Sequence, residues 1–147
     1  MPHSGMVDAL GNVRQAIRPG GLLVDLQPTT DDPLLSLVGP AHEEPLGRLD
    51  YRSDWPDLAA AEEAMATALA RGWFARRADE VFAFDIVCDT LADFEDYQRG
   101  RSDPAPNLAE LTAVAATALA GRGPEARLAV RRWIRCRTYD VLEGRRV

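Results

Sequence analysis

Lysine is absent from the 147 residues, cysteine occurs only twice, and aromatic residues make up 7%. The two cysteines, Cys88 and Cys136, are too few for a disulfide framework, so we expect free thiols. No run of residues approaches the roughly 18 consecutive apolar positions that a membrane-spanning helix needs. The first residues also lack the basic and apolar segments of a secretory signal. We therefore expect a cytoplasmic protein that does not enter the membrane.

What is present has the composition of a folded domain. Hydrophobic residues make up 46% and charged residues 27%, and the net charge is -6. This length and composition predict a single domain over residues 1–147. An acidic protein is not expected to bind nucleic acid generally, because neutralising phosphates dominates that binding. Residues 121–147 differ from the rest, since they hold eight arginines against three acids.

The first segment has an unusual order of elements. Apolar residues at helical spacing predict a helix over 5–18, which ends at Pro19-Gly20-Gly21. Residues 22–27 then form a run that is apolar on both faces, which is typical of an interior strand in a parallel sheet. A helix that leads into such a strand is the second half of a crossover unit. No first strand precedes it here, so we expect one edge of strand 22–27 to be unpaired.

The remaining segments predict an α/β domain with a small mixed sheet. Prolines at several positions predict a loop over 28–45, followed by a short strand over 46–52. Alternation predicts strands over 81–88 and 127–139. Helices are predicted from Asp54 or Asp57 to Arg71, from Thr90 to Arg99 and from Asn107 to Gly121. Thr90 with Asp93, and Asn107 with Glu110, are each expected to cap a helix start.

Two stretches carry a resemblance to a known family. Val7–Leu10 and Val13–Val24, with Arg18-Pro19-Gly20-Gly21 before an apolar strand, resemble the central helix and fifth strand of class I S-adenosylmethionine-dependent methyltransferases. Later segments are similar to the C-terminal half of bacterial members. These are Leu46–Asp50, Ala70–Phe74, 81–87, Asp93–Tyr97 and the arginine-rich last strand. The resemblance implies a partial Rossmann-like fold in which strands 22–27, 127–139 and 81–88 lie side by side in that order. It also implies that the last strand is antiparallel to its neighbours.

The resemblance covers only the second half of the family's fold. Complete members hold S-adenosyl-L-methionine on a glycine-rich turn after the first strand and on an acid that ends the second. This chain has no such turn and no such acid, so no catalytic or cofactor-binding residue is carried over. We therefore expect a truncated methyltransferase-like protein that does not bind the cofactor alone. A complete form would transfer a methyl group to a small-molecule acceptor, and whether this chain is itself an enzyme stays open.

A second hypothesis belongs to a different class of function. The bare edge of strand 22–27 would suit a non-catalytic interaction module that pairs with another strand. Its partner would be a second copy of the chain, giving a homodimer, or a separately encoded N-terminal half.

Individual residues suggest few other sites. His3, His42, Cys88 and Cys136 have none of the spacings of metal ligands, so we expect solvated histidines, buried thiols and no metal. Asp25 lies towards the end of its strand, where open α/β sheets place ligands, but a structural role, with the carboxylate hydrogen-bonded to a nearby turn, is favoured.

The last strand carries a row of arginines together with Trp133 and Tyr139. Guanidinium groups and aromatic rings could bind a single-stranded nucleic acid. The favoured interpretation is that these arginines pair with Asp85, Asp89 and other acids on neighbouring strands.

Overall fold

The computed structural model describes residues 3–101 and 103–143, with the side chains of residues 3 and 4 excepted. It divides into two compact units, and each is described by itself. Unit 1 consists of Met1–Thr29, Asp54–Phe82 and Ile134–Val147, and unit 2 of Thr30–Ser53 and Ala83–Trp133. The prediction of one domain over 1–147 stays a prediction.

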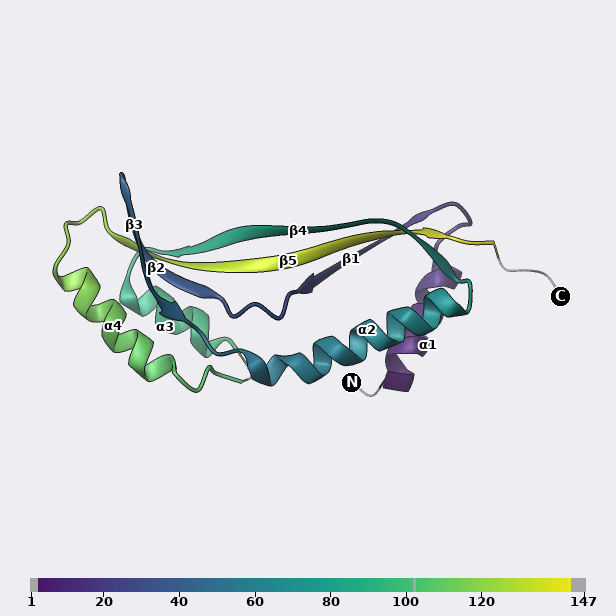
Figure 1. Cartoon of the computed structure of the whole chain (residues 1–147), viewed down its shortest axis with the longest axis horizontal. Coiled ribbons are helices and arrows are strands. Elements are labelled where there is room, and N and C mark those ends of the chain that lie inside the picture. Colours follow the sequence, from purple (N-terminus) through teal and green to yellow (C-terminus); the bar gives the residue numbers. More distant parts are fainter. Residues whose placement is uncertain (1–2, 102, 144–147) are drawn as a thin grey trace. The chain divides into compact units, whose positions relative to one another are not determined.

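Five strands form one sheet. They are β1 (Leu22–Pro28), β2 (Leu34–Gly39), β3 (His42–Arg48), β4 (Phe74–Cys88) and β5 (Arg127–Val141). Their order is β1-β5-β2-β3, and β4 pairs with β5 (Figure 1). All neighbouring strands are antiparallel. The α/β class is confirmed, but the expected mixed sheet is wrong, because no parallel pair occurs in the part of the chain described.

The predicted order of three strands is confirmed. β5 lies between β1 and β4, and Leu22 to Pro28 of β1 face Asp140 to Ile134 of β5 in antiparallel register. This is the order that the methyltransferase resemblance implies for strands 22–27, 127–139 and 81–88. β4 is longer than predicted, since it begins at Phe74. Whether the fold is a partial Rossmann-like methyltransferase fold stays a prediction.

Unit 1 places two helices against its strands. They are α1 (His3–Ala16) and α2 (Trp55–Ala70), which lie side by side (Figure 1). Alanine is the strongest helix former and fills much of α2. The helix ends at Ala70, and Gly72 two residues later has a φ of 66°. The buried apolar cluster of this unit consists of Met65, Ala68, Phe74, Tyr139 and Val141.

The predicted burial of β1 between two layers is wrong. Its side chains alternate between exposed and half-buried positions. Leu23 packs against the apolar cluster of unit 1, whereas Leu22, Val24 and Leu26 are exposed. A strand that is apolar on both faces therefore has only one face covered among the described residues.

Unit 2 contains a hairpin that the sequence pattern does not predict. The predicted loop over 28–45 is wrong from Leu34 to Gly39 and from His42 on, because β2 and β3 pair there. The short strand predicted over 46–52 overlaps β3 only as far as Arg48. Proline lacks a backbone N–H and is tolerated on edge strands. β3 is the end strand of the sheet, and Pro45 lies within it opposite Ser36, next to a shift in register.

The two remaining helices of unit 2 begin in different ways. α3 (Leu91–Arg99) has the predicted capping box, in which the Thr90 hydroxyl accepts from the Asp93 N–H at 3.1 Å and the Thr90 N–H donates to the Asp93 carboxylate at 2.9 Å. For α4 (Leu108–Ala120) the predicted cap is wrong. The Asn107 amide instead accepts from the Asp50 N–H and donates to the Arg48 carbonyl oxygen, so it ties down the chain after β3. A 3-10 turn, η1 (Arg52–Asp54), follows that chain segment.

Candidate functional site

The open edge of β1 is an exposed feature of unit 1. Within the residues described, β1 has β5 as its one sheet neighbour, so its other edge has no strand partner. Leu22, Val24 and Leu26 are 46%, 51% and 60% exposed. The strand carries one charged side chain, Asp25. An apolar strand with an open edge is a template for pairing with another strand.

The hydrogen bonds at the start of β1 show which backbone groups point outward. Val141 donates its N–H to the Gly21 carbonyl oxygen at 2.9 Å and accepts from the Gly20 N–H at 3.0 Å. Bonded pairs recur at every second residue of an antiparallel ladder. In the register of β1 with β5, the backbone groups directed at β5 therefore belong to Leu23, Asp25 and Gln27. Those of Leu22, Val24 and Leu26 point away from β5, along the open edge.

Asp25 lies on the other face of β1. Its carboxylate accepts from the Gln27 side-chain amide at 3.0 and 3.2 Å, and Arg137 is its register partner on β5. Burial raises the pKa of Asp25, and the hydrogen bond from Gln27 and the charge of Arg137 oppose that rise. Arg137 is itself buried and pairs with Glu62 of α2 at 2.7 Å. These contacts support the structural role predicted for Asp25, although its hydrogen-bond partner is a side chain on the same strand.

The arginines of β5 pair with acids, as the favoured interpretation predicted. Arg131 contacts Asp85 of β4 at 2.8 Å and Glu43 of β3 at 3.1 Å, and Arg127 contacts Asp89 at 2.7 Å. The pairing with Asp85 raises the pKa of Arg131. These guanidinium groups are engaged within the chain, which disfavours the nucleic-acid interpretation.

The aromatic residues of β5 do not form a stacking platform with those arginines. Tyr139 is fully buried, and Trp133 lies under the Arg48 guanidinium, whose carbon is 5.2 Å from the ring centre. Arg132 breaks the alternation of β5, and its guanidinium carbon lies 5.7 Å from the Tyr51 ring centre.

A buried polar pair lies beneath a groove of unit 2. The Tyr51 hydroxyl donates to the Gln98 Oε1 at 2.9 Å, and Arg101 stacks on the Tyr51 ring at 3.6 Å. Burial raises the pKa of Tyr51. The groove, of about 760 Å³, is bordered by α3, α4 and the segment Pro104–Pro106. Gln98 is fully buried, so it forms the floor of the groove and does not present its amide to solvent.

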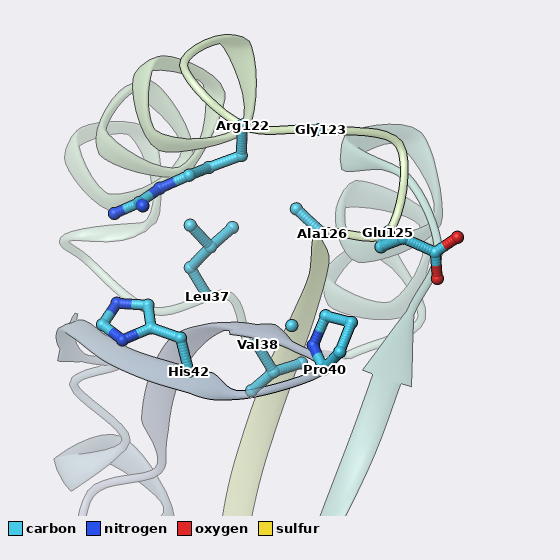
Figure 2. A pocket seen from close by; sticks show the side chains of 9 residues that line it. Leu37, Val38, Pro40, His42, Arg122, Gly123, Glu125 and Ala126 are labelled. Carbon is cyan, nitrogen blue, oxygen red and sulfur yellow. The ribbon is translucent and has the colours of Figure 1, made fainter.

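A smaller pocket of about 150 Å³ lies between the turn of the β2–β3 hairpin and the end of α4. Figure 2 shows Leu37 and Ala126 in its wall, with Arg122 extending over Leu37 towards His42. The guanidinium of Arg122 is paired with Glu44 at 2.6 Å, and His42 lies 3.6 Å from the same carboxylate. The Arg122 guanidinium at this pocket is thus paired with a carboxylate of the same chain.

The histidines and cysteines considered as metal ligands do not cluster in the described part of the chain. Cys88 is buried and Cys136 half-buried, and both thiols are free. Burial raises the pKa of the Cys88 thiol, so it stays protonated near neutral pH. The His3 side chain lies outside the described residues. Across the residues that the structure describes, no three His, Cys, Asp or Glu side chains gather as metal ligands would, and no helix is long and apolar enough to cross a membrane.

Comparison with known proteins adds no assignment: no family model, no curated protein and no solved structure matches the chain. The candidate site is therefore the open edge of β1 with Leu22, Val24 and Leu26. The unpaired edge is predicted by the order of elements in the sequence, but the exposure of these three side chains is not. The run is apolar on both faces, which is typical of a strand covered on both sides, so the pattern did not indicate that one face is exposed.

Proposed function

We propose that this chain is the C-terminal, acceptor-side part of an S-adenosylmethionine-dependent methyltransferase-like protein. The observation that supports the proposal is the strand order β1-β5-β4 with β5 antiparallel in the middle, which the family resemblance predicts from sequence. The open edge of β1 is where a further strand would extend this sheet. In the complete protein, a cofactor-binding part would join there, and the methyl group would pass to a small-molecule acceptor.

The residues of this chain do not fit S-adenosylmethionine. A cofactor cradle needs a glycine turn that follows a strand, so that the backbone can approach the ligand closely. Gly20 and Gly21 instead follow α1 and precede β1. The Gly21 N–H donates to the Arg18 carbonyl oxygen at 2.9 Å, and a Cβ on Gly21 would lie 2.8 Å from that same oxygen. This turn closes a helix, so we expect no cofactor binding by the chain alone.

Two measurements test the proposal. Calorimetric titration of the isolated chain with S-adenosylmethionine should show no binding, and micromolar affinity would contradict the cofactor-free state. Sequencing the transcript upstream of the codon for Met1 should reveal an in-frame G-x-G-x-G segment. Joining that segment to the chain should then produce S-adenosylmethionine binding. Absence of such a segment from the transcript and from neighbouring genes would remove the basis of the methyltransferase proposal.

A second candidate is a non-catalytic module that pairs through the edge of β1. Two features of Leu22, Val24 and Leu26 favour it. Their backbone N–H and C=O groups point along the open edge, and their apolar side chains are exposed. Backbone hydrogen bonds then supply affinity, and alternate side chains supply specificity. Light scattering tests this second candidate, which predicts a homodimer or a complex with a separately encoded half, and a stable monomer at high concentration would contradict it.

A further inference from the structure

We propose that unit 1 holds a binding site for a small organic monocarboxylate, in a pocket between the ends of α1, α2 and β5. The pocket has a volume of about 600 Å³, and its wall includes Arg14, Arg71, Trp73, Leu142 and Glu143. All of these residues belong to unit 1. The volume lies within the range of small-molecule sites. The site goes beyond methyl transfer and strand pairing, and it depends on neither.

The backbone of the pocket wall is held in place by hydrogen bonds. After α2 the chain turns at Gly72, whose φ of 66° lies in the left-handed region that suits glycine. The Trp73 N–H then donates to the Ala68 carbonyl oxygen at 3.1 Å, and the Trp73 carbonyl oxygen accepts from the Leu142 N–H at 3.0 Å. The indole also packs against the apolar cluster of unit 1. The aromatic wall of the pocket is therefore positioned by the fold itself.

Two guanidinium groups border this wall, one from each helix. The Arg71 guanidinium carbon lies 5.0 Å from the centre of the Trp73 ring. A Cβ added at Gly11 of α1 would lie 3.4 Å from the same ring, so α1 approaches the ring at a residue without a side chain. Arg14 is one turn further along α1 and lies on the same face of the helix. Both arginines and the indole thus border one pocket.

These two arginines differ from those of β5, which pair with acids. Neither Arg14 nor Arg71 forms an ion pair with a carboxylate in the described part of the chain. The Nε–H of Arg14 is buried and has no hydrogen-bond partner among the described residues. Buried polar groups are normally satisfied, and the planar guanidinium fork matches a carboxylate. A carboxylate in the pocket would give the two guanidinium groups the acceptors that the chain does not provide.

The surrounding charges favour a ligand with a single negative charge. Arg14 lies in the last turn of α1 and Arg71 directly follows α2, where basic residues offset the negative ends of the helix dipoles. Glu143 places a carboxylate in the same wall. The pocket therefore has little excess positive charge, so guanidinium hydrogen bonds carry recognition and a phosphate dianion is disfavoured. Trp73 and the exposed Leu142 offer an apolar wall to the body of the ligand.

Titration with phenylacetate tests the site, with the indole N–H signals of the three tryptophans followed in proton–nitrogen correlation NMR spectra. The Trp73 signal, assigned by its loss in Trp73→Phe, should shift and saturate with a dissociation constant of about 1 mM. The signals of Trp55 and Trp133 should not move. Phenylacetamide, which has nearly the same shape but no charge, should bind at least about tenfold more weakly. Absence of a saturable shift at Trp73, or equal binding of the two compounds, overturns the proposal.

Matched variants assign the binding to the two arginines. Arg14→Gln and Arg71→Gln should each weaken phenylacetate binding at least about tenfold, because each removes a charged hydrogen-bond donor. Arg18→Gln is the control, since it removes the same charge from an exposed arginine that does not border the pocket, and it should bind as the natural protein does. The correlation spectra also show that each variant is folded. Equal weakening by all three substitutions would indicate a general charge effect and overturn the site.

A phosphate ligand separates the two classes of anion. Phenyl phosphate should bind more weakly than phenylacetate, because its second charge meets Glu143 and the ends of two helices. Glu143→Gln should narrow the difference between the two compounds. Tighter binding of phenyl phosphate to the natural protein overturns the assignment to carboxylates.

Discussion

The buried pair of Tyr51 and Gln98 offers a stability prediction that can be worked out in magnitude. Tyr51→Phe removes the hydroxyl that donates to Gln98 Oε1 and keeps the ring on which Arg101 stacks. The Gln98 Nε2 already lacks a hydrogen-bond partner among the described residues. The substitution would therefore leave the whole amide buried without partners, and an unsatisfied buried acceptor costs about 1–3 kcal/mol. We expect a loss of about 2 kcal/mol, which corresponds to about 6 °C in Tm for a chain of this length.

A double-mutant cycle separates the hydrogen bond from other effects. Gln98→Leu alone should also destabilise the protein, since it leaves the Tyr51 hydroxyl buried without an acceptor. Replacing both partners by apolar groups can be nearly neutral, so the double variant should lose less than about 1 kcal/mol. Urea unfolding followed by circular dichroism measures the free energy of unfolding of all four proteins. The slope of this free energy against urea concentration should be the same in each. A double variant as unstable as the sum of the single variants would refute the reasoning.

Three further predictions concern local features. Thr90→Ala should cost about 1 kcal/mol of unfolding free energy by removing the cap of α3, and an unchanged urea midpoint would contradict the cap. Gly47→Ala should lower the free energy of unfolding by about 1–3 kcal/mol, because the added Cβ would lie 2.6 Å from Leu111 Cδ2. In a double variant, Leu111→Ala removes the atom that clashes, so the two losses should sum to more than the loss of the double variant. Additive losses in urea unfolding would contradict the clash. Burial raises the pKa of Asp25 in the folded protein. Its charged form therefore destabilises the fold at pH values above this folded-state pKa, and the penalty disappears as the pH falls below the pKa of Asp25 in the unfolded chain. Asp25→Asn should therefore be more stable than the natural protein at pH 7, and the difference in stability should shrink as the pH is lowered. Thermal unfolding at several pH values measures this difference, and a difference that grows on acidification would contradict the prediction.

Features governed by neighbouring residues could be predicted from the sequence. The ends of α2 and the capping box at Thr90 depend on signals within a few positions. The pairing of Arg131 with Asp85 also followed, because a basic strand and an acidic strand were expected to be neighbours.

Features governed by distant partners could not be predicted. Asn107 has the sequence environment of a helix cap, yet its amide bonds to Arg48 and Asp50, which lie 59 and 57 positions away. The prolines around β3 indicate a loop, but an edge strand needs only part of its backbone hydrogen-bonded and so accommodates Pro45. Neither the hydrogen-bond partners of Asn107 nor the edge position of β3 can be inferred from the neighbouring residues in the sequence.

The sequence by itself determined the α/β class, three of the five strands and the expectation of an open edge at residues 22–27, because hydrophobic periodicity and turn residues act over short ranges. Only the tertiary structure decided which face of β1 is covered. Leu23 and Leu26 are chemically identical side chains on one strand, and one packs against the cluster of unit 1 while the other is 60% exposed. Burial depends on what the rest of the chain places above each face, and that is a property of packing, which the residue type alone does not specify.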